Sequence, residues 1–180
     1  MYLWIGLGVS KNTENSIRKY CRFINKKIKA NEHSFSLPQH ISLKTSFNTD
    51  CYKEIIEILK KRFCDSSKLQ LQITGVEQVP GVIWLNIQEK DCLRKYHNDI
   101  LSILKDKYSI DKYGYDGDTF KFHSTLFQDV DNKDLIQLLY DKIDEDYFKD
   151  IIVEVDRIYF GISEIGKVGT YKVVDYIDLK

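Results

Sequence analysis

Two short stretches of the chain place a histidine two residues before a hydroxyl side chain, a pattern suited to acid–base chemistry on a phosphate. They are His40-Ile41-Ser42-Leu43 and His123-Ser124-Thr125-Leu126. Both lie in runs typical of β-strands, where residues i and i+2 point to the same face. Each histidine should therefore project beside its own hydroxyl. If the two strands lie together, two imidazoles and two hydroxyls converge on one spot.

Histidine titrates near neutrality, so a pair of histidines can supply a general base and a general acid at once. The phosphoryl oxygens gain negative charge in the transition state and need fixed hydrogen-bond donors. Ser42 and Thr125 are candidate phosphate-binding groups, and Lys44 shares their predicted strand face by parity. The alternative for Lys44 is a side chain at the groove rim that points into water. The alternative for both histidines is a buried, hydrogen-bonded core position.

Four aromatic residues are candidates for stacking on a base, and for each of them plain core packing is the alternative. They are Trp4, Trp84, Tyr115 and Phe127. By strand parity Phe127 should face the same side as the second motif, whereas Phe47 should face the core. His97 borders the apolar stripe of a helix, which predicts a packed, hydrogen-bonded histidine rather than a catalytic one.

Strands and helices must position these residues, and the hydrophobic pattern predicts their order. Strands are expected over residues 2–9, 39–47, 68–79, 82–88, 119–128, 150–160 and 170–179. Helices are expected to begin within residues 10–13 and end near residue 30, to span 51–64 and 91–108, and to begin again within 131–134. This order reads βαβαβ followed by βαβαββ.

The repeated order indicates one domain, residues 1–180, made of two similar halves of approximately residues 1–80 and 81–180. Trp4 and Trp84 recur with nearly the same offset as the two motif histidines. An Arg-Lys-Tyr tripeptide that begins at Arg18 recurs at Arg94, in the paired helices. An approximate two-fold axis between the halves would place His40 and His123 across a central groove.

Composition limits the partners. The chain has 180 residues, of which 43% are hydrophobic and 30% charged, and its formal net charge is zero. No general electrostatic attraction to nucleic acid follows, so a nucleotide must be held by a local site. This favours small nucleotides over long RNA.

From the cysteines and the first residues of the chain we expect a cytoplasmic protein. The four cysteines lack metal-binding spacing and are expected as reduced thiols. The first residues do not resemble a secretory leader, and no stretch has the length of a membrane span. We expect a monomer without a cofactor, a metal site or a membrane contact.

The two motifs resemble those of the two-histidine (2H) phosphoesterase superfamily, which includes the bacterial 2′-5′ RNA ligase-like proteins. That pattern has two His-x-Thr/Ser-x motifs, apolar at the last position and roughly 70 to 90 residues apart. Pro38, just before the first histidine, is also common in the family. Ser42 stands where threonine is commoner, and Ser124 where an apolar residue is more usual.

The resemblance implies an α+β fold with two antiparallel-sheet lobes, related by a pseudo-two-fold axis, and outer helices around a central groove. It implies a metal-independent phosphodiesterase acting on 2′,3′-cyclic phosphates or on 2′-5′-linked nucleotides or RNA ends, with His40 and His123 catalytic. Two alternatives stay open. One is a non-catalytic nucleotide- or RNA-binding module of the same fold, and the other is RNA-end 2′-5′ ligation by the same groups in reverse.

Overall fold

Seven strands and five helices make up the part of the chain that the computed structural model describes, which is residues 1–28, 35–110 and 116–180. The strands are β1 (Tyr2–Val9), β2 (His40–Asn48), β3 (Leu69–Val79), β4 (Val82–Ile87), β5 (His123–Gln128), β6 (Ile152–Ser163) and β7 (Lys172–Asp178). The helices are α1 (Lys11–Ile28), α2 (Tyr52–Phe63), α3 (Asp91–Tyr108), α4 (Lys133–Tyr140) and α5 (Asp146–Lys149).

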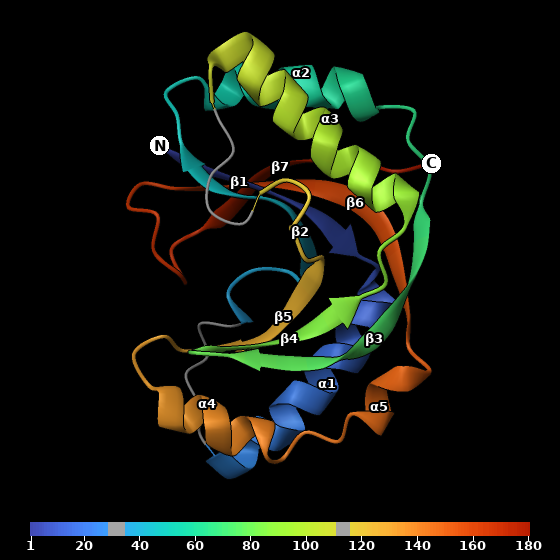
Figure 1. Ribbon diagram of the computed structural model, residues 1–180, viewed down its shortest axis with the longest axis vertical. Coiled ribbons are helices and arrows are strands. Elements are labelled where there is room, and N and C mark those ends of the chain that lie inside the picture. Colours follow the sequence, from blue (N-terminus) through green and yellow to red (C-terminus); the bar gives the residue numbers. More distant parts are fainter. Residues whose placement is uncertain (29–34, 111–115) are drawn as a thin grey trace.

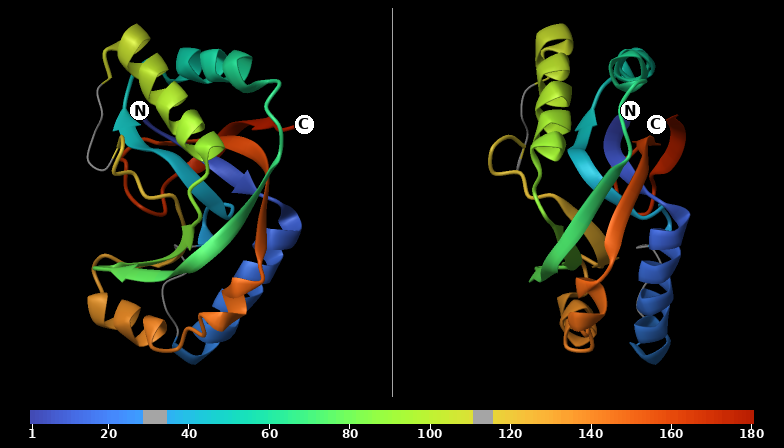
Figure 2. Two further views of the ribbon diagram at one scale, coloured as in Figure 1. Left: turned by 45° about the vertical axis from the view of Figure 1, so that its right-hand side comes forward. Right: turned by 90° about the vertical axis from the view of Figure 1, so that its right-hand side faces the viewer.

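All strand pairs are antiparallel, and the strands follow the order β2-β1-β6-β3-β4-β5, with β7 also paired to β6. Strand β3 changes partner along its length. Residues 69–72 pair with β6, and residues 73–79 pair with β4. The sheet therefore divides into a first wing (β1, β2, β6 and β7) and a second wing (β3, β4 and β5), which Figures 1 and 2 show on either side of the molecule's centre.

The helices cover the outer faces of the two wings (Figure 1). Helix α3 contacts β2 and α2 contacts β7, so both lie on the first wing. Helices α4 and α5 contact β4 and β3 of the second wing, and α1 contacts both β5 of the second wing and β6 of the first. This arrangement confirms the predicted α+β class with antiparallel lobes and outer helices.

The two wings do not coincide with the two halves of the sequence. Helix α1 comes from the first half but packs on β5 of the second, and α3 comes from the second half but packs on β2 of the first. Because each half lends a helix to the strands of the other, the predicted halves interlock. Their origin by internal duplication stays a prediction.

Strand β1 shows how alternation builds the core. Leu3, Ile5 and Leu7 are fully buried on its outer face. On the opposite face the indole of Trp4 lies against two glycines. A Cβ at Gly6 would lie 2.3 Å from that ring, and one at Gly161 of β6 would lie 2.7 Å from it. The glycines therefore leave the space that the Trp4 ring occupies.

Two details differ from the sequence-based expectation. The second motif strand begins at His123, so the predicted residues 119–122 precede the strand instead of belonging to it. The short helix α5 was not expected from the sequence. It has only one buried side chain, Phe148, so its residues show no hydrophobic periodicity. A helix this short has too few residues to show an amphipathic repeat.

Candidate active site

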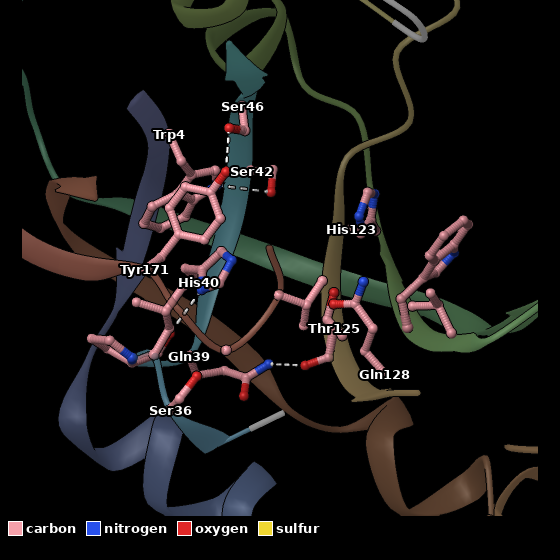
Figure 3. Close-up of a pocket in the computed structure, with 16 residues that line it drawn as sticks. Trp4, Ser36, Gln39, His40, Ser42, Ser46, His123, Thr125, Gln128 and Tyr171 are labelled. Atoms are coloured by element: carbon pink, nitrogen blue, oxygen red, sulfur yellow. Dashed lines mark hydrogen bonds between the residues drawn. The ribbon is translucent and has the colours of Figure 1, made fainter. Parts of the chain in front are cut away.

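A groove of about 330 Å³ lies between the two wings and contains both motif histidines (Figure 3). Its lining comes from β1, β2, β4 and β5 and from the segments before β2 and after β6. The residues are Trp4, Ser36, Leu37, Pro38, Gln39, His40, Ser42, Ser46, Val82, Trp84, His123, Thr125, Gln128, Val168, Gly169 and Tyr171. The structure thus brings together His40, His123, Ser42, Thr125, Trp4 and Trp84, all of which the sequence had singled out.

The two imidazoles are held in the same way. His40 Nδ1 lies 2.7 Å from the Pro38 carbonyl oxygen, and His123 Nδ1 lies 2.9 Å from the Lys121 carbonyl oxygen. A carbonyl can only accept, so Nδ1 carries the proton in both rings. In each case the partner is two residues earlier in the chain. Nε2 is therefore the nitrogen available to a molecule in the groove.

A tryptophan from the neighbouring strand packs on each histidine. The rings of Trp4 and His40 are 4.2 Å apart between centroids and meet edge to face, at 64°. The rings of Trp84 and His123 are 4.4 Å apart and stacked, at 29°. Trp4 Nε1 also donates to Ser42 Oγ at 3.4 Å. Both tryptophans contact the groove and fix the imidazoles, and stacking on a base stays a prediction for them.

Helix α1 positions the first motif through two charged residues on one face. Arg18 donates to the Phe35 carbonyl at 3.1 Å and also to the Leu37 carbonyl. Glu14 accepts from the Gln39 backbone N–H at 3.1 Å and pairs with Arg18 at 2.8 Å. These contacts fix the segment that supplies the Pro38 carbonyl to His40.

Arg94 of α3 positions the segment before the second motif. It donates to the carbonyls of Gly117 and Phe120 at 2.6 and 2.9 Å, and both oxygens of Glu89 hold its guanidinium. The segment that it fixes leads into β5. Arg18 and Arg94 begin the two matching tripeptides of the sequence, and in the structure they have matching tasks.

The two histidines differ in their electrostatic surroundings. Burial lowers the pKa of His40 to about 4, against the hydrogen bond to Pro38, which raises it. Burial also lowers the pKa of His123, and there both the Lys121 carbonyl and the Glu77 carboxylate act in the opposite direction. His40 is therefore neutral at pH 7, while His123 has a carboxylate nearby that favours its charged form.

The structure corrects the prediction that Lys44 binds phosphate. Its side chain is fully buried on the outer face of β2 and pairs with Asp116 at 2.7 Å. Strand β2 carries an irregularity here, since Gly6 pairs with Ser42 whereas the preceding Ile5 pairs with Lys44. The extra residue, Leu43, reverses the parity that had placed Lys44 in the groove.

The prediction that Phe127 stacks on a base is also wrong, for the same reason. Trp84 pairs with Thr125 but Ile83 pairs with Phe127, so Leu126 is an extra residue in β5. Phe127 consequently turns to the core, where it is 1% exposed and meets Phe35 edge to face. Tyr115, the remaining stacking candidate, lies outside the described residues.

Several groove residues carried no motif in the sequence. Ser46 and Tyr171 share a hydrogen bond between their hydroxyls, and Figure 3 shows the Tyr171 ring beside Trp4 and His40. Gln128 lies on the opposite side, beyond Thr125. Tyr171 comes from the segment between β6 and β7, far from either motif in the sequence, so only the fold brings it to the groove.

His97 has the structural role predicted for it. It is fully buried, and its Nδ1 donates to the Leu43 carbonyl at 2.6 Å while its Nε2 accepts from the Gly117 N–H at 2.9 Å. Both ring nitrogens are thereby used. In the described ranges, no group of three or more His, Cys, Asp or Glu side chains gathers as metal ligands do. None of the described helices is long and apolar enough to cross a membrane.

The fold and the groove define a class, the two-lobed α+β proteins with a histidine pair across a central groove. The family model described as the 2′-5′ RNA ligase superfamily matches residues 22–164. The chain belongs to this superfamily, among the 2H phosphoesterases. A comparison with curated protein sequences gave no match.

Solved structures agree on the fold at low sequence identity. Escherichia coli LigT in its apo form has a TM-score of 0.64 at 15% identity, over 99% of this chain and 96% of LigT. The protein TT0787 of Thermus thermophilus has a TM-score of 0.68 at 13% identity, over 99% and 98%. Kluyveromyces marxianus Usb1 has a TM-score of 0.50 at 16% identity, over 99% and 97%. LigT is also known in complexes with 3′-AMP, ATP and NADP+.

Proposed function

We propose that this protein is a phosphodiesterase that hydrolyses 2′,3′-cyclic phosphates or 2′-5′-linked nucleotides by two-histidine general acid–base catalysis without a metal ion. One observation carries the proposal. Each imidazole donates its Nδ1 proton to the carbonyl two residues earlier, and both rings line one groove. Two oriented Nε2 atoms are what a reaction with two proton transfers needs.

His40 is assigned as the base and His123 as the acid. The lowered pKa of His40 leaves it neutral, and the Glu77 carboxylate favours a proton on His123. For a 2′,3′-cyclic phosphate, His40 Nε2 takes a proton from water as the water oxygen bonds to phosphorus. The bond from phosphorus to one ribose oxygen breaks, and His123 Nε2 protonates that oxygen. The product is a phosphomonoester beside a free hydroxyl.

The hydroxyls of Ser42 and Thr125 are assigned to the phosphoryl oxygens. Each stands two residues after its histidine and lines the same groove. Donors fixed where charge develops contribute more to the transition state than to the ground state. The nucleotide complexes of LigT support a nucleotide as the substrate, and the groove volume is at the small end of the range for ligand sites.

Hydrolysis of a 2′,3′-cyclic nucleotide and a 2′-5′ dinucleotide in the presence of EDTA tests the proposal. Wild type should turn over at least one of them, and His40→Ala and His123→Ala should each lose about a hundredfold or more in kcat. Thermal unfolding of all three proteins checks that the variants are folded. Turnover that stops with EDTA, or that survives in both variants, would refute the mechanism.

The same assay separates the alternatives. Nucleotide binding without turnover across a broad panel would point to a binding module. Joining of RNA ends when both ends are supplied, in preference to hydrolysis, would point to ligation. Hydrolysis is the expected direction in dilute aqueous solution.

A further inference from the structure

The two motif strands belong to different wings, so something must set the distance between their histidines. Strands β2 and β5 stand at opposite ends of the strand order. The backbone ladder that joins them passes through β1, β6, β3 and β4. Small changes of twist along such a path add up, and the ladder alone would leave the spacing of His40 and His123 loosely defined.

Two buried side chains join the motif strands directly. Ser124 Oγ donates to the His40 carbonyl at 2.7 Å. The Gln39 side-chain nitrogen donates to Ser124 Oγ at 2.7 Å and to the Thr125 carbonyl at 2.8 Å. Gln39 is 6% exposed and Ser124 is 1% exposed. Buried hydrogen bonds of this kind are shielded from competition by water.

Each of the three protons that this cluster donates has an acceptor. Gln39 has two amide protons and uses them on two acceptors, Ser124 Oγ and the Thr125 carbonyl. Ser124 has one hydroxyl proton and gives it to the His40 carbonyl, while its oxygen accepts from Gln39. The cluster therefore has one consistent arrangement, with backbone partners at His40 in the first motif and Thr125 in the second.

The position of Ser124 explains why a polar residue stands where the family usually has an apolar one. In β5 its side chain points away from the groove, because it lies between His123 and Thr125 and pairs with the buried Leu85. An apolar side chain there would fill the core but would bond to nothing in β2. The serine links the second motif to the backbone of the first histidine.

We propose that Gln39 and Ser124 form a clamp that fixes the separation of His40 and His123 and so positions both imidazoles on one phosphate. This inference rests on the proposed function for its catalytic consequence. A misplacement of about 1 Å can cost a hundredfold in rate. Gln39 and Ser124 are thus positioning residues, and neither takes part in proton transfer.

The test compares Ser124→Ala and Gln39→Leu with Ser124→Thr, which keeps the hydroxyl. On the substrate found for wild type, Ser124→Ala and Gln39→Leu should lose about ten- to a hundredfold in kcat with KM changed less than about threefold, and Ser124→Thr should recover most of the loss. Leu139→Ala in α4 is the control for stability. It removes a fully buried core side chain from a helix that contributes no residue to the groove lining, so it should lower the melting temperature but leave kcat near wild type.

Two measurements hold whether or not turnover is found. The unfolding free energies of Ser124→Ala, Gln39→Leu and the double variant should be non-additive, because the residues are bonded to each other. Crystal structures of wild type and Ser124→Ala should differ in the separation of the two Nε2 atoms. Additive energies with an unchanged separation, or full kcat in Ser124→Ala, would overturn the clamp. An inactive wild type with coupled energies and a changed separation would refute only the proposed function.

Discussion

At the scale of single residues, the two histidines share the same geometry but differ in their electrostatic surroundings. In both rings Nδ1–H donates to a carbonyl two residues earlier, and a tryptophan packs on each ring. Their charged neighbours differ, since the Glu77 carboxylate alone acts on His123 and raises its pKa, whereas Arg18 lowers and Glu14 raises the pKa of His40. A symmetric pair would have no preferred direction of proton transfer, and the neighbouring charges supply one.

This asymmetry predicts the pH dependence of activity. The base, His40, must be neutral, so activity should rise as pH passes its pKa of about 4. The acid, His123, must be protonated, so activity should fall as pH rises through its pKa, which burial places below the ordinary histidine value of about 6.5. A profile of kcat/KM against pH, which reports the free enzyme, should peak between these values.

Glu77→Gln provides the matched variant for this prediction. Removing the carboxylate takes away a charge that favours protonated His123, so the falling limb should move to lower pH while the rising limb stays in place. Circular dichroism at each pH checks that the protein stays folded. A wild-type optimum above pH 7, or movement of the rising limb alone, would contradict the assignment of base and acid.

At the scale of elements, sequence periodicity predicted most strands and helices. It did not predict which face of the sheet the side chains after each motif occupy. Helix α3 spans 91–108 and strand β1 spans 2–9, both as predicted. The alternation of side chains between the two faces breaks just after His40-x-Ser and His123-x-Thr. One extra residue in each strand turns Lys44 and Phe127 to the core. A bulge depends on the partner strand, so a single strand's residues do not reveal it.

The buried position of Lys44 predicts a role in stability in place of the phosphate-binding role. Both side chains of the Lys44–Asp116 pair are 0% exposed, and Thr45 Oγ1 donates to the same carboxylate at 3.1 Å. In Lys44→Met the Asp116 charge loses its cation, and the unfolding free energy should fall by about 3–5 kcal/mol. Below the melting temperature, kcat/KM should change less than about threefold, because Lys44 does not line the groove.

Lys60→Met is the control for that experiment. Lys60 pairs with Asp175 at 2.9 Å, but the two side chains are 38% and 35% exposed. Its loss should leave the unfolding free energy nearly unchanged, since water screens such a pair. A large rise in KM for Lys44→Met without loss of stability would restore the phosphate-binding role. Chemical denaturation and steady-state kinetics on the same preparations decide between the two.

At the scale of the whole molecule, the fold class and the histidine pair were predictable, whereas the arrangement of the halves was not. Hydrophobic alternation gave the order of elements, and the paired motifs gave His40 and His123. The exchange of α1 and α3 between halves depends on contacts between segments far apart in sequence. The same is true of Tyr171, which reaches the groove only through packing, and of the contacts that Gln39 makes with Ser124 and Thr125.

The charge of the molecule and the lining of its groove together predict a weak salt dependence. The formal net charge is zero, and the groove is lined by imidazole, hydroxyl, amide, indole, phenol and aliphatic groups. One protonated imidazole facing one phosphate gives a slope of about −0.7 in log affinity against log salt. Between 50 and 200 mM salt, kcat/KM for a dinucleotide should therefore fall by about threefold or less, whereas a protein with six to ten phosphate contacts loses about 10³ or more.

Kinetics on a dinucleotide and on a long single-stranded RNA with the same end group measure both slopes. Equal shallow slopes would identify the end group as the part recognised, and a steep slope on the long RNA would reveal an electrostatic surface beyond the groove and contradict a small-nucleotide site.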